Sequence, residues 1–126
     1  MIVGIGIDLV QIERFAKALG APHGARFEER VFTERERADC GSKAGRIACL
    51  AARFAAKEAC LKALGTGWSA GLSFRQVQVT RGEGGRPVLE LSGRASERAL
   101  SLGVRSMHVS LTHEPGIAAA VVVLEG

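Results

Sequence analysis

Four charged side chains interrupt an otherwise apolar stretch, ARFAAKEACLKALGTG, which spans residues 52–67. They are Arg53, Lys57, Glu58 and Lys62, one acid among three bases. The simpler interpretation is a helix surface on which Glu58 and Lys62 form an i,i+4 pair, worth a few tenths of a kcal/mol. The excess of bases favours an anion site instead. The Gly-Thr-Gly loop that follows points the same way, because backbone N–H groups of such a loop can approach phosphate closely.

A further acid lies near the start of the chain, in the segment GIGIDLV. Asp8 ends an apolar run that predicts a strand over residues 2–8, and helical periodicity begins directly after it. An Asp in this position commonly caps a helix N-terminus, which would account for it alone. With Glu58, however, Asp8 supplies the one or two protein carboxylates that Mg²⁺ prefers beside substrate phosphate oxygens. Lysines and arginines then neutralise the remaining phosphate charge, so the two acids predict a Mg²⁺–pyrophosphate site.

The segment HVSLTHEPG places two histidines five residues apart. Such a spacing points them to opposite faces of an ideal strand, so His108 and His113 are not expected to share a metal ion. His113 lies in a turn predicted over residues 113–116. There it could bind phosphate through its side chain and backbone, or it could be an ordinary exposed histidine.

Composition limits the classes of protein to consider. The chain has 126 residues, 47% of them apolar and 24% charged, which suits one globular domain. A net charge of +4 favours an acidic partner such as a phosphorylated metabolite, an acidic protein or nucleic acid. Nucleic acid ranks low because 5% aromatic residues without tyrosine leave few rings for base stacking. No apolar run approaches the roughly 18 residues of a membrane span.

The three cysteines, Cys40, Cys49 and Cys60, lack the spacing of a metal site. Cys49 and Cys60 fall within the apolar pattern of the central helix, so we expect both to be small buried residues. A reducing cytoplasm follows as the expected compartment.

The apolar periodicity predicts a single α+β domain over residues 1–126, with an antiparallel sheet, a long central helix and shorter helices. After the first strand, the predicted elements in chain order are helices over residues 9–19, 22–32, 34–40 and 46–64, a hairpin over 74–92, a helix over 93–103 and a hairpin over 106–126. Thr33 and Glu36 form a predicted capping box, and Gly65 is the predicted C-cap of the central helix.

Four segments follow one another in the order and at the separations of a known family. They are GIGIDLVQIERF (4–15), FTERE (32–36), RFAAKEACLKALGTG (53–67) and HVSLTHEPGIAAAVVV (108–123). On these segments nearly the whole chain resembles the holo-acyl-carrier-protein synthase family, the small trimeric class of 4′-phosphopantetheinyl transferases. The G-x-D, K-E-x-x-x-K-x-x-G-T-G and S-x-T-H pieces are weak singly and specific together.

The resemblance implies the 4′-phosphopantetheinyl transferase fold and an enzyme that uses coenzyme A and an apo acyl carrier protein. A carrier serine attacks the pantetheine-side phosphorus of the pyrophosphate, which gives holo carrier protein and adenosine 3′,5′-bisphosphate. The resemblance further implies Mg²⁺, a homotrimer with active sites between subunits, and a cytoplasmic place in lipid metabolism and fatty acid biosynthesis. It leaves open whether the carrier is of fatty-acid or polyketide type.

By the same resemblance, the metal ligands fall on Asp8 and Glu58, and Lys62 falls close to the reacting phosphate. Arg14 falls on the first-helix surface that meets the acidic carrier. The coenzyme A phosphate positions fall on Arg53, Lys62, Gly65, Thr66, Gly67 and His113. Asp8, Glu58, Lys62 and a metal-bound water all remain possible general bases, and Lys57 contacts either the ligand or an acid. The alternative to an enzyme is a basic module that binds a nucleotide or nucleic acid.

Overall fold

The structure is a computed structural model that describes residues 1–66 and 71–126. Its strands are β1 (Ile2–Gln11), β2 (Val77–Arg81), β3 (Pro87–Leu91), β4 (Ser106–Glu114) and β5 (Ile117–Glu125). Its helices are α1 (Ile12–Gly20), α2 (Gly24–Val31), α3 (Glu34–Cys40), α4 (Arg46–Leu64) and α5 (Gly93–Ser101), with 3₁₀ turns η1 (Phe74–Gln76) and η2 (Glu83–Gly85).

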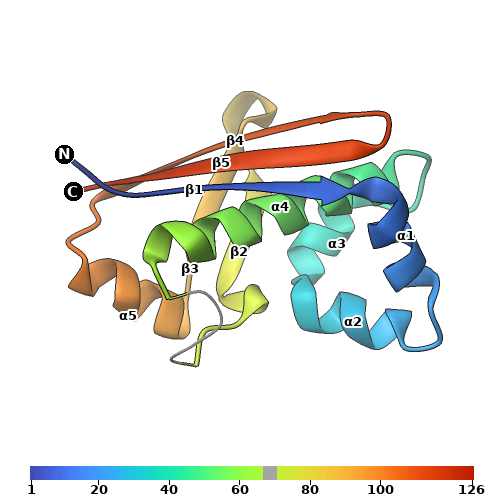
Figure 1. Cartoon of the computed structure of the whole chain (residues 1–126), viewed down its shortest axis with the longest axis horizontal. Helices are drawn as coiled ribbons and strands as arrows, with labels where there is room; N and C mark the ends of the chain where they lie inside the picture. The colour runs from blue at the N-terminus through green and yellow to red at the C-terminus, as the bar shows by residue number, and fades with distance from the viewer. Residues whose placement is uncertain (67–70) are drawn as a thin grey trace.

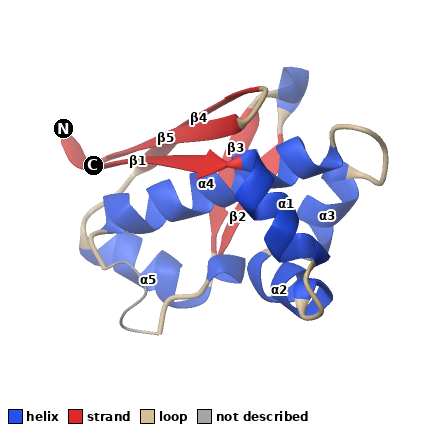
Figure 2. Ribbon diagram, turned by 45° about the vertical axis from the view of Figure 1, so that its right-hand side comes forward, coloured by secondary structure: helices blue, strands red, loops and turns tan. Residues whose placement is uncertain are grey.

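An antiparallel sheet in the order β1-β5-β4 lies along α4, which is the centre of the molecule. In Figure 1, α1, α2 and α3 gather at one end of α4 and α5 lies at the other. The β2–β3 hairpin packs against α4 from another side (Figure 2). The α+β class, the antiparallel sheet and the long central helix are therefore confirmed.

Small residues let β1 lie almost directly on α4. A Cβ at Gly6 would fall 2.9 Å from the carbonyl carbon of Ala59, and one at Gly4 would fall 3.1 Å from that of Ala63. Side chains larger than hydrogen would therefore collide with the helix backbone. The alanine-rich side of α4 allows this close approach, and β1 is the element that packs there.

Local signals set the ends of several elements as predicted. Thr33 and Glu36 form the full capping box of α3. The central helix α4 runs over the predicted residues, and Gly65 closes it in the left-handed conformation, with φ at 79°. Both devices act within a few residues, which is why the sequence predicts them well.

Two of the boundaries that differ from the prediction concern candidate site residues. The first strand continues past Asp8 to Gln11, because β1 pairs with β5 as far as Gln11 opposite Ile117. Asp8 therefore lies inside a strand opposite Ala120, and Gln11 is the residue before α1. His113 likewise lies in β4, opposite Ala118, and not in the turn. In each case the ladder of backbone hydrogen bonds extends beyond the apolar run.

The prediction for Cys49 was wrong. Cys49 forms a disulfide with Cys40, with 5.6 Å between the Cα atoms, because the turn after α3 returns the chain beside the start of α4. Cys60 is buried and free, as expected, and burial raises the pKa of its thiol to about 12. None of the helices in the described ranges is long and apolar enough to cross a membrane.

Candidate active site

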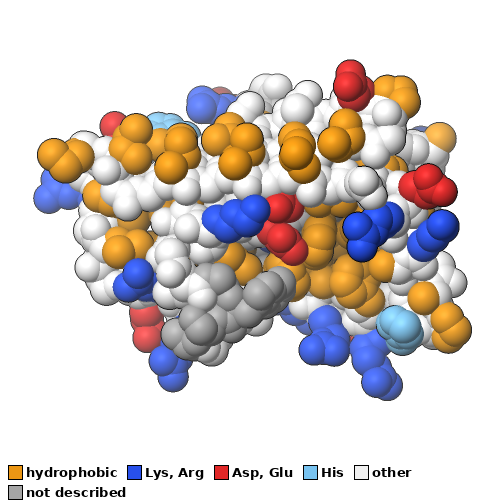
Figure 3. All heavy atoms as spheres, in the orientation of Figure 1, with side chains coloured by type: hydrophobic (Ala, Val, Ile, Leu, Met, Phe, Trp, Pro, Cys, Tyr) orange, Lys and Arg blue, Asp and Glu red, His pale blue; other side chains and the backbone are white. Residues whose placement is uncertain are grey.

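A hollow of about 730 Å³ opens between β1, α1 and α4. Its lining includes Asp8, Glu58 and Arg14 together with the rings of Phe15 and Phe54. We call it the carboxylate hollow. Figure 3 shows acidic side chains meeting an apolar depression below the sheet. The structure thus brings together two acids that are 50 positions apart in the sequence.

Lys62 crosses from α4 to β1 at the edge of this site. Its Nζ donates to Asp8 Oδ1 and to the Ile7 carbonyl oxygen, both at 3.0 Å. It is paired in this way with Asp8, and not with Glu58 as a surface i,i+4 pair. The Lys62 side chain is 55% exposed, whereas that of Asp8 is only 12% exposed. A lysine this exposed can turn to a bound anion while it remains beside the acid.

The surroundings of Glu58 disfavour its charged form. Burial raises the pKa of the Glu58 carboxyl, the negative charge of Asp8 raises it further, and Lys62 lowers it. Two partly desolvated acids that repel one another favour a cation between them. Their oxygens are the hard donors that suit Mg²⁺. Within 1–66 and 71–126, no group of three or more His, Cys, Asp or Glu residues is placed to hold a metal ion.

Arg53 lies outside the carboxylate hollow. It lines a separate hollow of about 330 Å³ together with Arg81 and Pro87. The residue is 5% exposed, and its Nη1 donates to Cys49 Sγ at 3.0 Å. Its Nε is buried without a hydrogen-bond partner. Burial lowers the pKa of this guanidinium, and the positive charge of Arg81 lowers it further. Two cationic side chains therefore line this hollow, while the acids Asp39 and Glu36 act to raise the pKa of Arg53. Sequence patterns gave no indication of Arg81.

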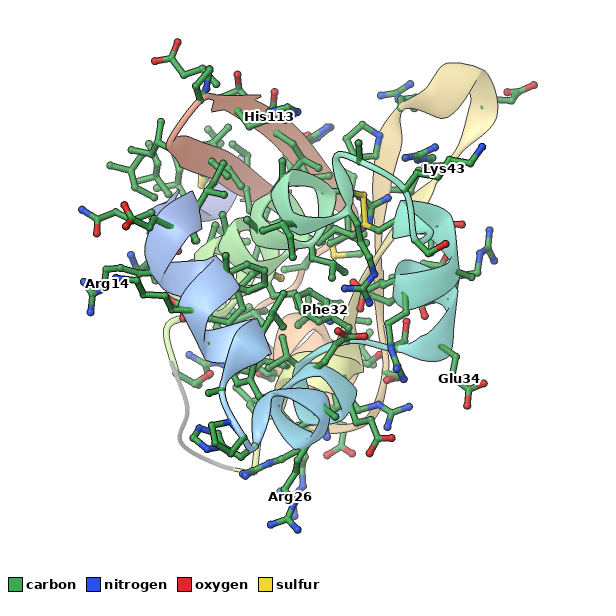
Figure 4. The ribbon with its side chains drawn as sticks, turned by 90° about the vertical axis from the view of Figure 1, so that its right-hand side faces the viewer. Arg14, Arg26, Phe32, Glu34, Lys43 and His113 are labelled. Carbon is green, nitrogen blue, oxygen red and sulfur yellow. A yellow bond between two sulfur atoms is a disulfide. The ribbon has the colours of Figure 1, made fainter. Side chains whose placement is uncertain are left out.

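His113 lines a third hollow, of about 290 Å³, with Thr112 and Glu114. The third hollow shares Ile117 with the carboxylate hollow. Figure 4 shows His113 and Arg14 on different parts of the molecule, with Arg14 pointing outward. Within one chain, the predicted phosphate ligands Arg53 and His113 are thus not assembled with the acids.

Gly65, the first residue of the Gly-Thr-Gly loop, is the predicted C-cap of α4. The Gly65 N–H donates to the carbonyl oxygens of Leu61 and Lys62, so it closes the helix. Thr66 follows directly, and Gly67 lies outside the described residues.

Lys57, whose role the sequence left open, contacts an acid. Its Nζ lies 2.7 Å from Glu36 Oε1, and both side chains are fully buried. The capping box identified Glu36, but no local signal links it to a lysine 21 positions later.

The fold and the carboxylate hollow define a class of protein: an α+β domain whose paired acids and lysine suit a phosphate ester with a divalent cation. The model of the 4′-phosphopantetheinyl transferase superfamily matches residues 4–122. The chain belongs to that superfamily.

Relatives cover the chain from end to end. The holo-[acyl-carrier-protein] synthase of Methylobacterium radiotolerans is 51% identical, over 99% of this chain and 94% of the relative. That of Maridesulfovibrio salexigens is 45% identical over 99% of both. The crystal structure of the Neisseria meningitidis synthase aligns with a TM-score of 0.88 and 33% identity over 100% of both chains. The Helicobacter pylori synthase in complex with coenzyme A aligns with a TM-score of 0.82 and 35% identity, over 96% of this chain and 99% of that one.

Proposed function

We propose that this protein is a holo-[acyl-carrier-protein] synthase, which transfers the 4′-phosphopantetheine arm of coenzyme A to a serine of an apo acyl carrier protein. The observation that carries the proposal is the meeting of Asp8 and Glu58 in one hollow, with Lys62 paired to Asp8 at its edge, in a chain whose full-length relatives have that name. The reaction forms a bond from the serine oxygen to the pantetheine-side phosphorus. It breaks the bond from that phosphorus to the bridging oxygen, which leaves with adenosine 3′,5′-bisphosphate. We propose a role in lipid metabolism and fatty acid biosynthesis, as the family resemblance implies.

The chain's own residues contribute position and charge, which are most of what phosphoryl transfer needs. Asp8 and Glu58 would hold Mg²⁺, which would neutralise pyrophosphate charge when bound. Their oxygen donors and mutual repulsion fit such an ion. Lys62 turns from Asp8 toward the phosphate oxygens and stabilises the charge that develops on them. The serine proton passes to a base within this same cluster.

The carrier protein is proposed to dock over Arg14, at the mouth of the carboxylate hollow. A fourth hollow, of about 620 Å³, lies under α2 and is lined by Arg26 and Arg30. Phe27 lines both hollows, so one acidic partner can cover the two. In Figure 4, Arg14 and Arg26 both point away from the molecule. Salt-screened attraction between these arginines and an acidic carrier would act mainly on the association step.

A homotrimer would cover the outer face of the sheet. Ile2, Ile5, Ile7 and Leu9 of β1 are between 59% and 64% exposed, and Figure 3 shows apolar side chains in a row along the sheet. A row of exposed apolar side chains is typical of a contact surface. In the proposed trimer, a neighbouring subunit brings Arg53 and His113 to the acids, which completes a coenzyme A site with Lys62 and the Gly65-Thr66-Gly67 loop.

The cytoplasm is the proposed location. Because Cys40 and Cys49 form a disulfide, the cysteines no longer indicate a reducing compartment. The assignment therefore rests on the proposed reaction and its bacterial relatives.

The reaction is tested by following release of adenosine 3′,5′-bisphosphate from coenzyme A. We expect release only when an apo carrier protein is present. Binding of coenzyme A without release, with several carriers, would support the alternative of a nucleotide-binding module.

The shared site is tested by mixing subunits. Asp8→Ala and His113→Ala proteins are each expected to be almost inactive, and exchanging their subunits should restore activity, because some interfaces then combine two intact halves. Mixtures no more active than the average of the two variants would show that each site lies within one subunit.

A further inference from the structure

The buried pair of Lys57 and Glu36 has no place in the proposed chemistry. Both side chains are 0% exposed, and Lys57 Nζ lies 2.7 Å from Glu36 Oε1. Taking two charges out of water is costly unless their hydrogen bonds are also satisfied. This pair satisfies them with backbone groups from three other parts of the fold.

The Lys57 ammonium group uses all of its donors within the protein. Besides Glu36, it donates to the Phe74 carbonyl oxygen at 2.8 Å and to the Val77 carbonyl oxygen at 2.6 Å. These oxygens lie where η1 leads into β2. An ammonium group has three N–H donors, so Lys57 has none left for a substrate.

The Glu36 carboxylate also accepts hydrogen bonds from the backbone at both of its oxygens. Its Oε1 accepts from the Thr33 N–H at 3.0 Å, and its Oε2 accepts from the Val79 N–H at 2.8 Å. Through these bonds the carboxylate joins the start of α3 to β2. The pair thereby ties α4 to two neighbouring elements at a single point.

The position of Lys57 on α4 affects the direction in which Glu58 projects into the carboxylate hollow. At about 100° per residue, Ala59 lies about 200° from Lys57, and Glu58 lies midway between them. The Ala59 side is pressed against β1 at Gly6, and the Lys57 side is tied to β2. The helix is therefore held on two nearly opposite sides, and Glu58 projects from the flank between.

We propose that Lys57, held by Glu36, is a positioning residue that sets the rotation of α4 and so aims Glu58 at Asp8. A second contact also links Lys57 to the hollow. Lys57 binds the carbonyl oxygen of Phe74, and the ring centroid of Phe74 lies 5.2 Å from that of Phe54, which lines the hollow. The inference rests on the proposed function, in which Asp8 and Glu58 hold a divalent cation.

The test measures Mn²⁺ binding by electron paramagnetic resonance, without coenzyme A or carrier protein. The variant is Glu36→Gln combined with Lys57→Met, which removes the donors to Phe74 and Val77 without leaving a buried unpaired charge. We expect Mn²⁺ affinity to fall about tenfold or more, as when residues that orient metal ligands are changed. We also expect the transfer rate to fall while the KM for the carrier protein stays unchanged.

Leu50→Ala is the matched control, because Leu50 is a fully buried residue on the same helix and lies outside this network. It should lower the melting temperature without changing Mn²⁺ affinity. Wild-type affinity in the double variant, or an equal loss in Leu50→Ala, would overturn the proposal. If the double variant does not fold, Lys57→Gln combined with Glu36→Gln takes its place, because two neutral amides satisfy part of the network and leave no buried charge. Unchanged Mn²⁺ affinity in that variant would overturn the proposal equally.

Asp8→Ala separates this inference from the proposed function. If Asp8→Ala binds Mn²⁺ like the wild type, the metal assignment fails, and the positioning role fails with it. If Asp8→Ala loses binding and the double variant keeps it, only the positioning role is overturned.

Discussion

Replacing Gly6 by alanine tests whether the contact between β1 and α4 sets the geometry of the site. The new Cβ would lie 2.9 Å from the carbonyl carbon of Ala59 and 3.0 Å from the nitrogen of Ala63, and closer still to the Ala59 oxygen. Two carbon atoms prefer roughly 3.5–4.0 Å. All three atoms belong to helix backbone and cannot turn aside, so strand and helix must separate by about 1 Å.

Separating the strand from the helix would move the two proposed metal ligands apart. Asp8 is two residues from Gly6 on the strand, and Glu58 is next to Ala59 on the helix. Misplacing reacting groups by about 1 Å can reduce a rate about 100-fold, whereas overpacking a core costs about 1–3 kcal/mol of unfolding free energy. We therefore expect Gly6→Ala to remain folded at room temperature and to lose about 100-fold in kcat/KM for transfer.

The assay follows kcat/KM for the transfer reaction together with thermal unfolding. Gly20→Ala is the control, because no atom lies within 4 Å of its added Cβ. It should change the unfolding free energy by less than about 0.5 kcal/mol and leave the rate unchanged. A Gly6→Ala protein that works within about twofold of the wild type would refute the idea that this contact sets the distance between the acids.

Four further predictions concern the acids, the carrier and the disulfide. Asp8→Ala or Glu58→Ala should abolish most turnover in a folded protein, and wild-type rates at limiting Mg²⁺ would contradict the metal assignment. Arg14→Glu should raise the KM for the carrier about tenfold with coenzyme A binding retained; an unchanged KM would contradict its docking role. Cys49→Ser should lower the unfolding free energy by about 2–3 kcal/mol, because the Cys40–Cys49 link closes a short loop; denaturant titration under oxidising and reducing conditions measures it, and equal stabilities would contradict it. The raised pKa of Glu58 means that its protonated form favours folding, so stability of the metal-free protein should fall as pH rises from 4.5, the ordinary value for glutamate, through the higher folded pKa; melting curves in EDTA should show this loss in the wild type and not in Glu58→Gln.

Features set by neighbouring residues could be predicted from the sequence. The ends of α4 and the capping box at Thr33 and Glu36 depend on interactions within one or two turns. The same holds for the close approach to α4, since a row of alanines indicates that some element lies near the helix backbone. Which element it is depends on pairing across the whole chain.

Features that depend on distant partners could not be predicted in this way. Asp8 reads as a helix cap until pairing with β5 extends its strand. Cys49 reads as a small apolar residue until the turn after α3 brings Cys40 beside it. Lys57 reads as a further phosphate ligand or an ion-pair partner, and only the packing of α3 against α4 decides between them.

The placement of Arg53 has a similar cause. Helical spacing puts it on the same helix as Glu58, but a difference of five positions turns it toward a different hollow. Its proposed role therefore needs a second subunit, which no periodicity within one chain can indicate.

The most direct test of the proposed transfer is mass spectrometry of an apo acyl carrier protein incubated with this protein, coenzyme A and Mg²⁺, with a parallel sample in EDTA. We predict that the carrier gains the mass of one phosphopantetheine arm on its serine, and that EDTA abolishes the gain. An unmodified carrier in the presence of folded protein that binds coenzyme A and Mg²⁺ would contradict the proposed transfer, and a gain unaffected by EDTA would contradict the role given to Asp8 and Glu58.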